Sequence, residues 1–144
     1  MRSAFANVVS AVITSLQAQP PVCKNIYRAR AMAVPDQDDM AISVQWEQSV
    51  PAGGTINGAP IDWTTRLTVE CYARGTSDES GDLAVDPLLK AVFERLAANS
   101  TLGGVVTDLQ VIGVEAENTT DGKKTGWVRL TYTADHRTSN FTLS

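Results

Sequence analysis

The fold class is decided by one stretch of the sequence, Trp63-Thr64-Thr65-Arg66-Leu67-Thr68-Val69-Glu70-Cys71-Tyr72. In an extended chain its odd-numbered residues are mostly apolar and fall on one side, whereas even-numbered residues such as Arg66 and Glu70 fall on the other. One buried face and one solvated face are typical of antiparallel sheets. The stretch therefore predicts a strand in a sheet that is covered on one side only.

Weaker strand patterns lie on both sides of this stretch. Ile42, Val44 and Trp46 alternate with polar residues, and Asp121-Gly122 is a tight-turn signal that predicts a hairpin. The further predicted strands are residues 22–32, 42–47, 105–117 and 126–134. Residues 49–60 are rich in Gly and Pro and predict a long, mobile loop.

Two segments carry apolar residues at helical spacing. Residues 5–16 form one apolar stripe that Pro20-Pro21 ends, and residues 86–98 form a second. Asp86-Pro87 fits an N-cap and a first helical position, so the second helix is expected to start there within about one turn. The alternative is that Leu83 and Val85 belong to an earlier helical turn that Pro87 tolerates or kinks. Gly103-Gly104 can take the left-handed conformation that closes a helix.

The order of these elements predicts an α+β fold, with an antiparallel-rich mixed β-sheet of about four to five strands packed against two α-helices and a β-hairpin near the C-terminus. A chain of 144 residues, of which 43% are hydrophobic, is the size of one domain, so residues 1–144 are expected to share one core. About the last eight residues carry no pattern and are predicted to form a flexible tail.

The totals disfavour several classes of protein. The net charge of −4 has the wrong sign for binding phosphate backbones, and no run approaches the roughly 18 apolar residues of a membrane span. The two cysteines, Cys23 and Cys71, fit neither a disulfide framework nor a zinc site, and a reducing compartment suits them best. Nucleic acid and membrane are therefore not expected as binding partners.

Residues able to carry catalysis are scarce. His136 is the only histidine, and Asp135 and Ser139 lie too close to it along the chain to converge with it on a pocket, so His136 is expected to be solvated. Cys71 falls on the inward side of a strand, where a thiol is inert. The sequence also lacks a metal-ligand cluster and a glycine-rich phosphate loop. We expect no enzyme, no catalytic residue, no metal and no cofactor.

Three tryptophans have different expected places. Trp46 and Trp63 lie on the apolar sides of their strands and are expected in the core, while Trp127 beside the hairpin turn is left unexplained. An alternative of another class is a small-molecule-binding or enzymatic α+β domain that uses Trp127, Tyr132 and His136.

The predicted first helix, the Trp46 strand, the Gly-rich loop, the Asp62–Arg74 strand and the following helix together resemble the tail terminator family, the minor tail protein U-like proteins of long-tailed siphophages. The likeness covers nearly the whole chain in the order and length of its elements. It implies a structural subunit that forms a ring, expected to be hexameric, which caps the tail tube, terminates its polymerisation and docks head-completion proteins.

The same resemblance implies the partners. These are further copies of the chain, the major tail tube protein and head-completion or connector proteins, with DNA only passing through the lumen and no membrane. The protein would lie in the host cytoplasm during assembly and afterwards at the head-proximal end of the virion tail. An alternative within this class is another head-tail joining or neck subunit.

Loops supply the predicted contact residues, because a closed ring needs two different complementary patches on each subunit. The candidates for interfaces are Gly53, Gly54, Thr55, Asn57, Arg74, Asp78, Glu79, Lys123 and Lys124. Asp36, Asp38 and Asp39 are predicted to face the lumen, where their charge would repel DNA phosphates.

Overall fold

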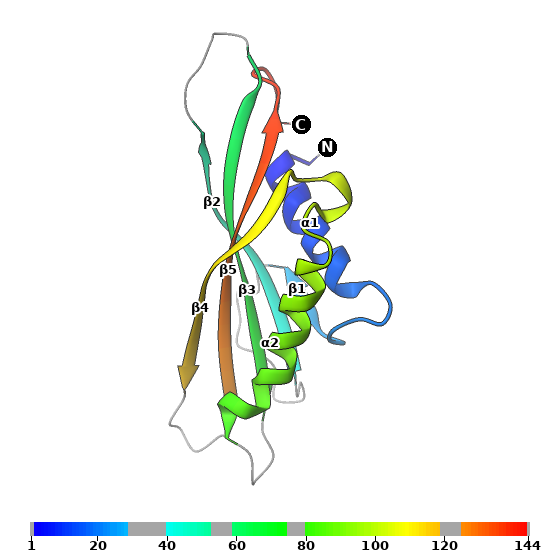
Figure 1. Ribbon diagram of the computed structural model, residues 1–144, viewed down its shortest axis with the longest axis vertical. Helices are drawn as coiled ribbons and strands as arrows, with labels where there is room; N and C mark the ends of the chain where they lie inside the picture. The colour runs from blue at the N-terminus through cyan, green and yellow to red at the C-terminus, as the bar shows by residue number, and fades with distance from the viewer. Residues whose placement is uncertain (1, 29–39, 53–58, 75–79, 119–124, 144) are drawn as a thin grey trace.

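The computed structural model describes residues 2–28, 40–52, 59–74, 80–118 and 125–143. Within these ranges the chain forms a five-stranded sheet and two α-helices (Figure 1). The elements are α1 (Ala4–Gln17), β1 (Ile26–Arg28), β2 (Met40–Pro51), β3 (Ile61–Arg74), α2 (Gly81–Ala97), the short 3-10 helix η1 (Leu102–Gly104), β4 (Asp108–Asn118) and β5 (Thr125–Thr138).

The strand order in the sheet is β1-β2-β3-β5-β4. β1 runs parallel to β2, and every other neighbouring pair is antiparallel. Both helices cover the same face of the sheet (Figure 1): α1 packs on β2 and β1, and α2 packs on β5, β3 and β4. The prediction of an α+β fold with a mixed, mostly antiparallel sheet and a C-terminal hairpin is confirmed.

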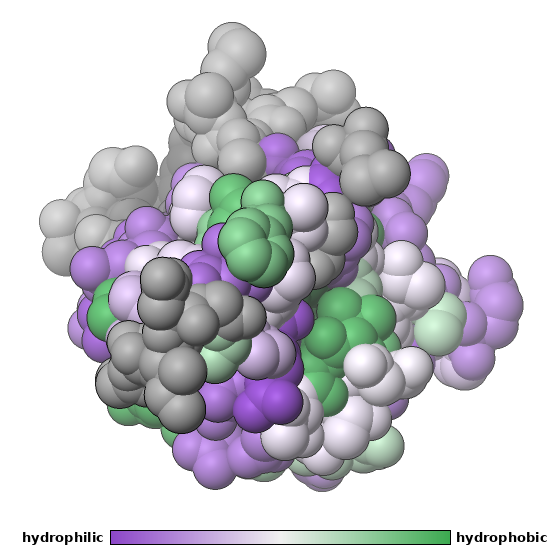
Figure 2. Space-filling model, turned by 90° about the horizontal axis from the view of Figure 1, so that it is seen from above, coloured by the Kyte–Doolittle hydropathy of each residue, from purple (hydrophilic) through white to green (hydrophobic). Residues whose placement is uncertain are grey.

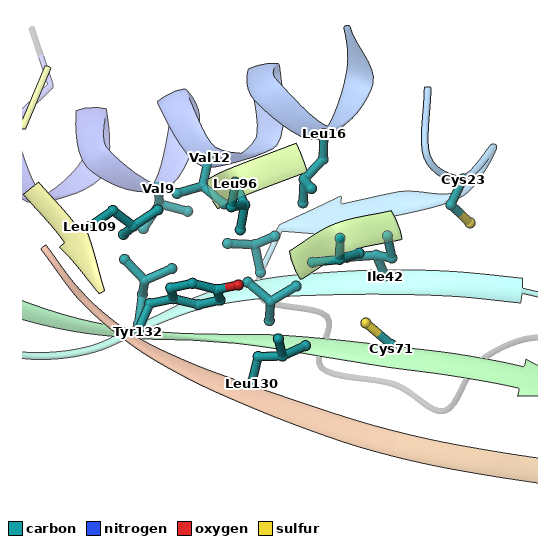
Figure 3. Packing of buried hydrophobic residues seen from close by; sticks show 14 of the residues in the cluster. Val9, Val12, Leu16, Cys23, Ile42, Cys71, Leu96, Leu109, Leu130 and Tyr132 are labelled. Carbon is teal, nitrogen blue, oxygen red and sulfur yellow. The ribbon is translucent and has the colours of Figure 1, made fainter. Parts of the chain in front are cut away.

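The core lies between the helices and this covered face. Leu67, Val69 and Cys71 of β3 are fully buried there. Val12 and Leu16 of α1 point toward the same face of the sheet and complete this part of the core (Figure 3). Burying side chains of this size contributes about 1.5–3 kcal/mol each. The alternation in β3 and the apolar stripe of α1 are therefore what the sequence predicted.

The second helix begins earlier than predicted. Its N-cap is Ser80, and Pro87 stands inside the helix instead of at its first position. Proline inside a helix removes a hydrogen bond, but the turn before it carries Val85, which is only 1% exposed. Burial of Val85 outweighs the local signal at Asp86-Pro87, so these two residues are not the helix start, and the alternative with Leu83 and Val85 in an earlier turn is the correct one.

β2 and β5 both extend beyond their predicted ends. The predicted loop from residue 49 is strand as far as Pro51, which pairs with Trp63. A bulge between Trp46 and Gln48 shifts the alternation there, and this shift hid the continuation. β5 runs to Thr138, which is 2% exposed and accepts a hydrogen bond from Trp63 Nε1 at 2.9 Å.

The other predicted boundaries differ in smaller ways. The first predicted hairpin strand begins at Asp108, because η1 occupies Leu102–Gly104 before it. Gly103 and Gly104 have φ values of 71° and 94°, which confirms the left-handed conformation predicted for this pair. The predicted tight turn at Asp121-Gly122 lies outside the described residues.

Candidate functional site

Most of the predicted contact residues lie outside the described part of the chain. These are Gly53, Gly54, Thr55, Asn57, Asp78, Glu79, Lys123 and Lys124, together with Asp36, Asp38 and Asp39. Arg74 is described: it ends β3, is half-buried, and donates a hydrogen bond from Nη2 to Tyr72 Oη at 3.2 Å. Its partner across the sheet is Thr125, so the residues flanking 75–79 and 119–124 lie at one end of the sheet.

Four aromatic rings meet at the opposite end and form what we call the aromatic end: Phe5, Trp46, Trp63 and His136. Phe5 stacks on Trp46 with centroids 5.5 Å apart and meets Trp63 and His136 edge-on at 5.0 and 5.7 Å. Trp63 is half-buried, but Trp46 is 53% exposed, because Phe5 belongs to the first turn of α1 and the helix covers the sheet no further. The core placement predicted for Trp46 is therefore wrong.

This end of the molecule presents other hydrophobic groups. Phe141 is 85% exposed, and Leu143 accepts a hydrogen bond from the backbone N of Ala4 at the start of α1. Figure 2, which looks at the molecule from the top of Figure 1, shows hydrophobic atoms at the surface among polar ones. The C-terminal residues thus reach the first turn of α1.

His136 is buried, with 6% of its surface exposed, so the expectation of a solvated residue is wrong. Its Nε2 atom lies 2.6 Å from Thr65 Oγ1, which is itself 2.8 Å from Ser49 Oγ. Desolvation lowers the pKa of His136 below its usual value, against a smaller opposing effect of Asp135. Tyr132, Ala134 and His136 follow one another at a spacing of two residues, and all three side chains are buried. Extending this alternation by one step in the sequence would have predicted that His136 faces inward.

The residues around His136 do not form a catalytic triad. Thr64 Oγ1 donates to Asp135 Oδ1 at 3.1 Å on the outer side of the sheet, whereas His136 bonds to Thr65 on the inner side. An open pocket of about 460 Å³ lies beside them, lined by Ala52, Asp62, Trp63, Thr64, Thr107, Asp135, His136 and Arg137. Asp62 and Arg137 are paired at 2.7 Å, and this pairing holds the pKa of the Asp62 carboxyl below its usual value.

Trp127 lies at the far end of β5 on the uncovered face. Its ring packs against Tyr72 with centroids 4.8 Å apart. Beside it, Arg129 pairs with Glu70 at 2.9 Å, and a shallow pocket of about 230 Å³ opens between β4, β5 and Glu70. Cross-strand packing therefore explains Trp127, for which the sequence offered no account.

The three residues of the small-molecule alternative do not converge. Tyr132 lies in the core, where desolvation raises its pKa to about 12, and Trp127 and His136 point to opposite faces of β5. Nine residues of extended strand separate the last two by roughly 30 Å. Among the described residues no three His, Cys, Asp or Glu side chains are grouped to hold a metal ion. No described helix is both long enough and apolar enough to cross a membrane.

The covered face is not covered to its edge. Val111 and Val114 of β4 stand opposite the buried Tyr132 and Leu130, so they belong to the helix side of the sheet, yet they are 36% and 52% exposed. Phe93 of α2 is 43% exposed. Phe93 falls within the second predicted apolar stripe, residues 86–98, and its exposure was not predicted. Periodicity indicates which side of an element is buried, but not how far the neighbouring element extends over it.

Comparison with known proteins identifies the fold. No protein-family model and no curated protein matches the sequence. Among solved structures, the chain matches a chain of "Virion of native gene transfer agent (GTA) particle" with a TM-score of 0.56 and 12% identity. The match covers 94% of this chain and 98% of that chain, so the two share one fold from end to end.

Proposed function

We propose that this protein is a structural subunit of a phage-type virion, and specifically the tail terminator: a ring, expected to be hexameric, that caps the tail tube, ends its polymerisation and docks head-completion proteins. The observation that carries the proposal is the end-to-end likeness to a chain of a gene transfer agent virion, with neither chain left largely unmatched. The helices and strands on which the sequence resembles the tail terminator family, α1, β2, β3 and α2, are all present in the fold.

The chemistry of the described residues supports a role in assembly over one in catalysis. The imidazole of His136 is buried against Thr65, and burial raises the pKa of the Cys71 thiol to about 12, which keeps it protonated and unreactive. Exposed apolar side chains, in contrast, stand at the aromatic end and along β4. Surfaces of this kind mark protein-protein contacts more often than isolated apolar residues do.

The partners under this proposal are other virion proteins: further copies of the chain, the tail tube protein and the head-completion or connector proteins. DNA would pass through the lumen without being bound, in keeping with the net charge of −4. The protein would assemble in the host cytoplasm and remain at the head-proximal end of the tail.

Removal of the gene from the phage that encodes it tests the proposal. Loss of a terminator gives tail tubes that exceed the normal length, because nothing stops their growth. Loss of a joining or neck subunit instead gives tails of normal length that fail to attach to heads. Negative-stain microscopy of purified protein mixed with tail tubes adds a direct test, in which annular particles are expected at tube ends.

A further inference from the structure

Three hydrogen bonds in a row join the buried imidazole of His136 to the exposed indole of Trp46. Trp46 Nε1 donates to Ser49 Oγ at 2.9 Å, and Ser49 Oγ lies 2.8 Å from Thr65 Oγ1. Thr65 Oγ1 in turn lies 2.6 Å from His136 Nε2. We call these four side chains the hydroxyl relay. His136 is 6% exposed and Trp46 is 53% exposed, so the relay connects the interior of the aromatic end with its surface.

The bulge in β2 brings Trp46 and Ser49 to the same side of the sheet. In a regular strand, two residues that are three apart face opposite sides. The register shifts between Trp46 and Gln48, which adds one residue to β2. Trp46 consequently stands opposite Leu67, and the partner of Ser49 is Thr65. Both partners are fully buried on the helix side, so the bulge is what makes the relay possible.

The properties of donors and acceptors fix the direction of the relay when His136 is neutral. An indole N–H can only donate, so Ser49 Oγ accepts from Trp46 and can pass its own hydrogen to Thr65. The Thr65 hydroxyl then donates to the lone pair on His136 Nε2, with the ring hydrogen on Nδ1. Every bond points from the surface toward the imidazole, and each strengthens the next.

Protonation of His136 reverses part of this direction. The imidazolium carries a hydrogen on Nε2 and must donate it to Thr65, so the Thr65 hydroxyl must turn and donate to Ser49. Ser49 Oγ then accepts two hydrogen bonds and donates none within the relay; because Ser49 is half-buried, its own hydrogen can turn to water. An oxygen that accepts twice without donating along the chain is a weaker acceptor for the Trp46 indole.

We propose that the hydroxyl relay is a proton switch, through which protonation of His136 weakens the hydrogen bond that holds the exposed Trp46 indole. The indole also stacks on Phe5, with ring centroids 5.5 Å apart, so it stays in place but is held less firmly. The apolar surface at the aromatic end therefore responds to pH. This switch acts within one copy of the chain and is independent of the ring in the proposed function.

The surroundings of His136 allow it to titrate. The ring helps to line the open pocket of about 460 Å³, through which water and protons reach it. Burial lowers its pKa against a smaller opposing effect of Asp135, so it is neutral at neutral pH and takes up a proton as the pH falls. α1 contributes Phe5 but no charged residue. The charged residues of the neighbouring segments are Asp62 of β3, Asp135 and Arg137 of β5, Asp108 of β4, Glu47 of β2 and Arg2 before α1.

The test follows the three indole N–H signals by nitrogen–proton correlation NMR of the full chain during an acid titration. In the wild type, the Trp46 signal should move with the midpoint of the His136 ring. The Trp63 signal should also move, because Trp63 stands opposite His136 and feels its charge through space. Trp127 is the internal reference, since roughly 30 Å of strand separates it from His136.

Ser49→Ala removes one member of the relay and leaves His136 and its charge in place. The response of Trp46 should fall below about half of its wild-type size, whereas the response of Trp63 should remain. Thr138→Val is the matched control, because Thr138 Oγ1 accepts from Trp63 Nε1 at 2.9 Å but lies outside the relay. In this control the response of Trp46 should stay unchanged.

A second pair of variants tests the relay without Ser49→Ala. Thr65→Ser keeps the hydroxyl and should keep the response of Trp46, whereas Thr65→Val removes the hydroxyl and should abolish most of it. Each variant is checked for folding by thermal melting before the titration. His136→Gln should remove the response of both Trp46 and Trp63.

Three results would overturn the switch. The first is a Trp46 response of equal size in the wild type, Ser49→Ala and Thr65→Val, which would mean that the charge acts through space alone. The second is a Trp46 response that persists in His136→Gln, which would assign the titration to a neighbouring carboxylate. The third is a Trp46 signal that stays constant until the protein unfolds in acid. None of these results bears on the terminator proposal.

Discussion

Val69 and Val114 are the same residue type on the same side of one sheet, yet Val69 is fully buried under the helices and Val114 is 52% exposed at the β4 edge. The difference comes from the reach of two helices across a five-stranded sheet. α1 and α2 close over the central strands, and the helix side of β4 extends past them. Apolar residues of the centre thus stabilise the fold, whereas those of the edge remain available for a partner.

Truncating the two valines breaks this comparison most directly. Val69→Ala should lower the free energy of unfolding by about 2–3 kcal/mol, because it loses buried methyl groups and leaves a cavity. Val114→Ala should change it by less than about 0.5 kcal/mol, since the side chain is already in water. Urea denaturation of both variants measures the difference, and equal losses would show that the edge valine also serves the fold.

The comparison also shows what the sequence could predict. The period of two in β3 and the helical stripe of α1 gave fold class, helix number and the inward side of Cys71 correctly, since each reflects which side of an element is buried. The exposure of Trp46 and Phe93 could not be predicted from such patterns. It depends on where a neighbouring helix ends or how wide the sheet is, and both are set by tertiary packing.

The predicted end of β2 and the predicted start of α2 were inaccurate for a related reason. The bulge after Trp46 and the proline inside α2 are local signals that usually end an element. The hydrogen bond between the Ser49 and Thr65 hydroxyls and the burial of Val85 nevertheless stabilise the strand and the helix beyond these signals. The candidate contact residues were chosen from loops, and of these only Arg74 is described. The exposed apolar residues Phe93, Val111 and Val114 lie on regular elements, where the search for loops did not look.

Alkaline pH sharpens the comparison, because two groups of the buried centre, Cys71 and Tyr132, titrate there with raised pKa values, whereas the edge valine carries no titratable group. Desolvation raises the pKa values of Cys71 and Tyr132 from 9.0 and 10.0 to about 12 each. Between those values the unfolded chain loses protons that the folded chain keeps, so stability is full below about pH 9 and falls as the pH rises toward 12. Denaturation midpoints measured across this window should fall steadily, and less steeply in Cys71→Ala.

Tyr132→Phe is expected to change the free energy of unfolding by a smaller amount, and to raise it. Within the described residues the Tyr132 hydroxyl is buried without a hydrogen-bond partner, so its removal deletes a desolvated polar group and keeps the ring (Figure 3). The variant should gain about 1 kcal/mol of stability at neutral pH. Its stability should also fall less than that of the wild type as the pH rises above about 9, because one of the two titrating groups is gone. A loss of stability would instead reveal a partner for the hydroxyl.

His136 lies between the two regions, buried but packed on the aromatic end where Trp46 is exposed. Its pKa is lowered by desolvation, so below the unfolded value of 6.5 the unfolded chain binds a proton that the folded chain resists. The stability contributed by neutral His136 is therefore present above pH 6.5 and lost as the pH falls through its folded pKa. His136→Gln, which keeps a hydrogen-bonding group near Thr65, should flatten the decline in stability below pH 6.5. The imidazole also contacts Phe5 of the aromatic end. Weakened ring assembly of this variant at neutral pH, with its fold intact, would place the aromatic end in a contact between subunits.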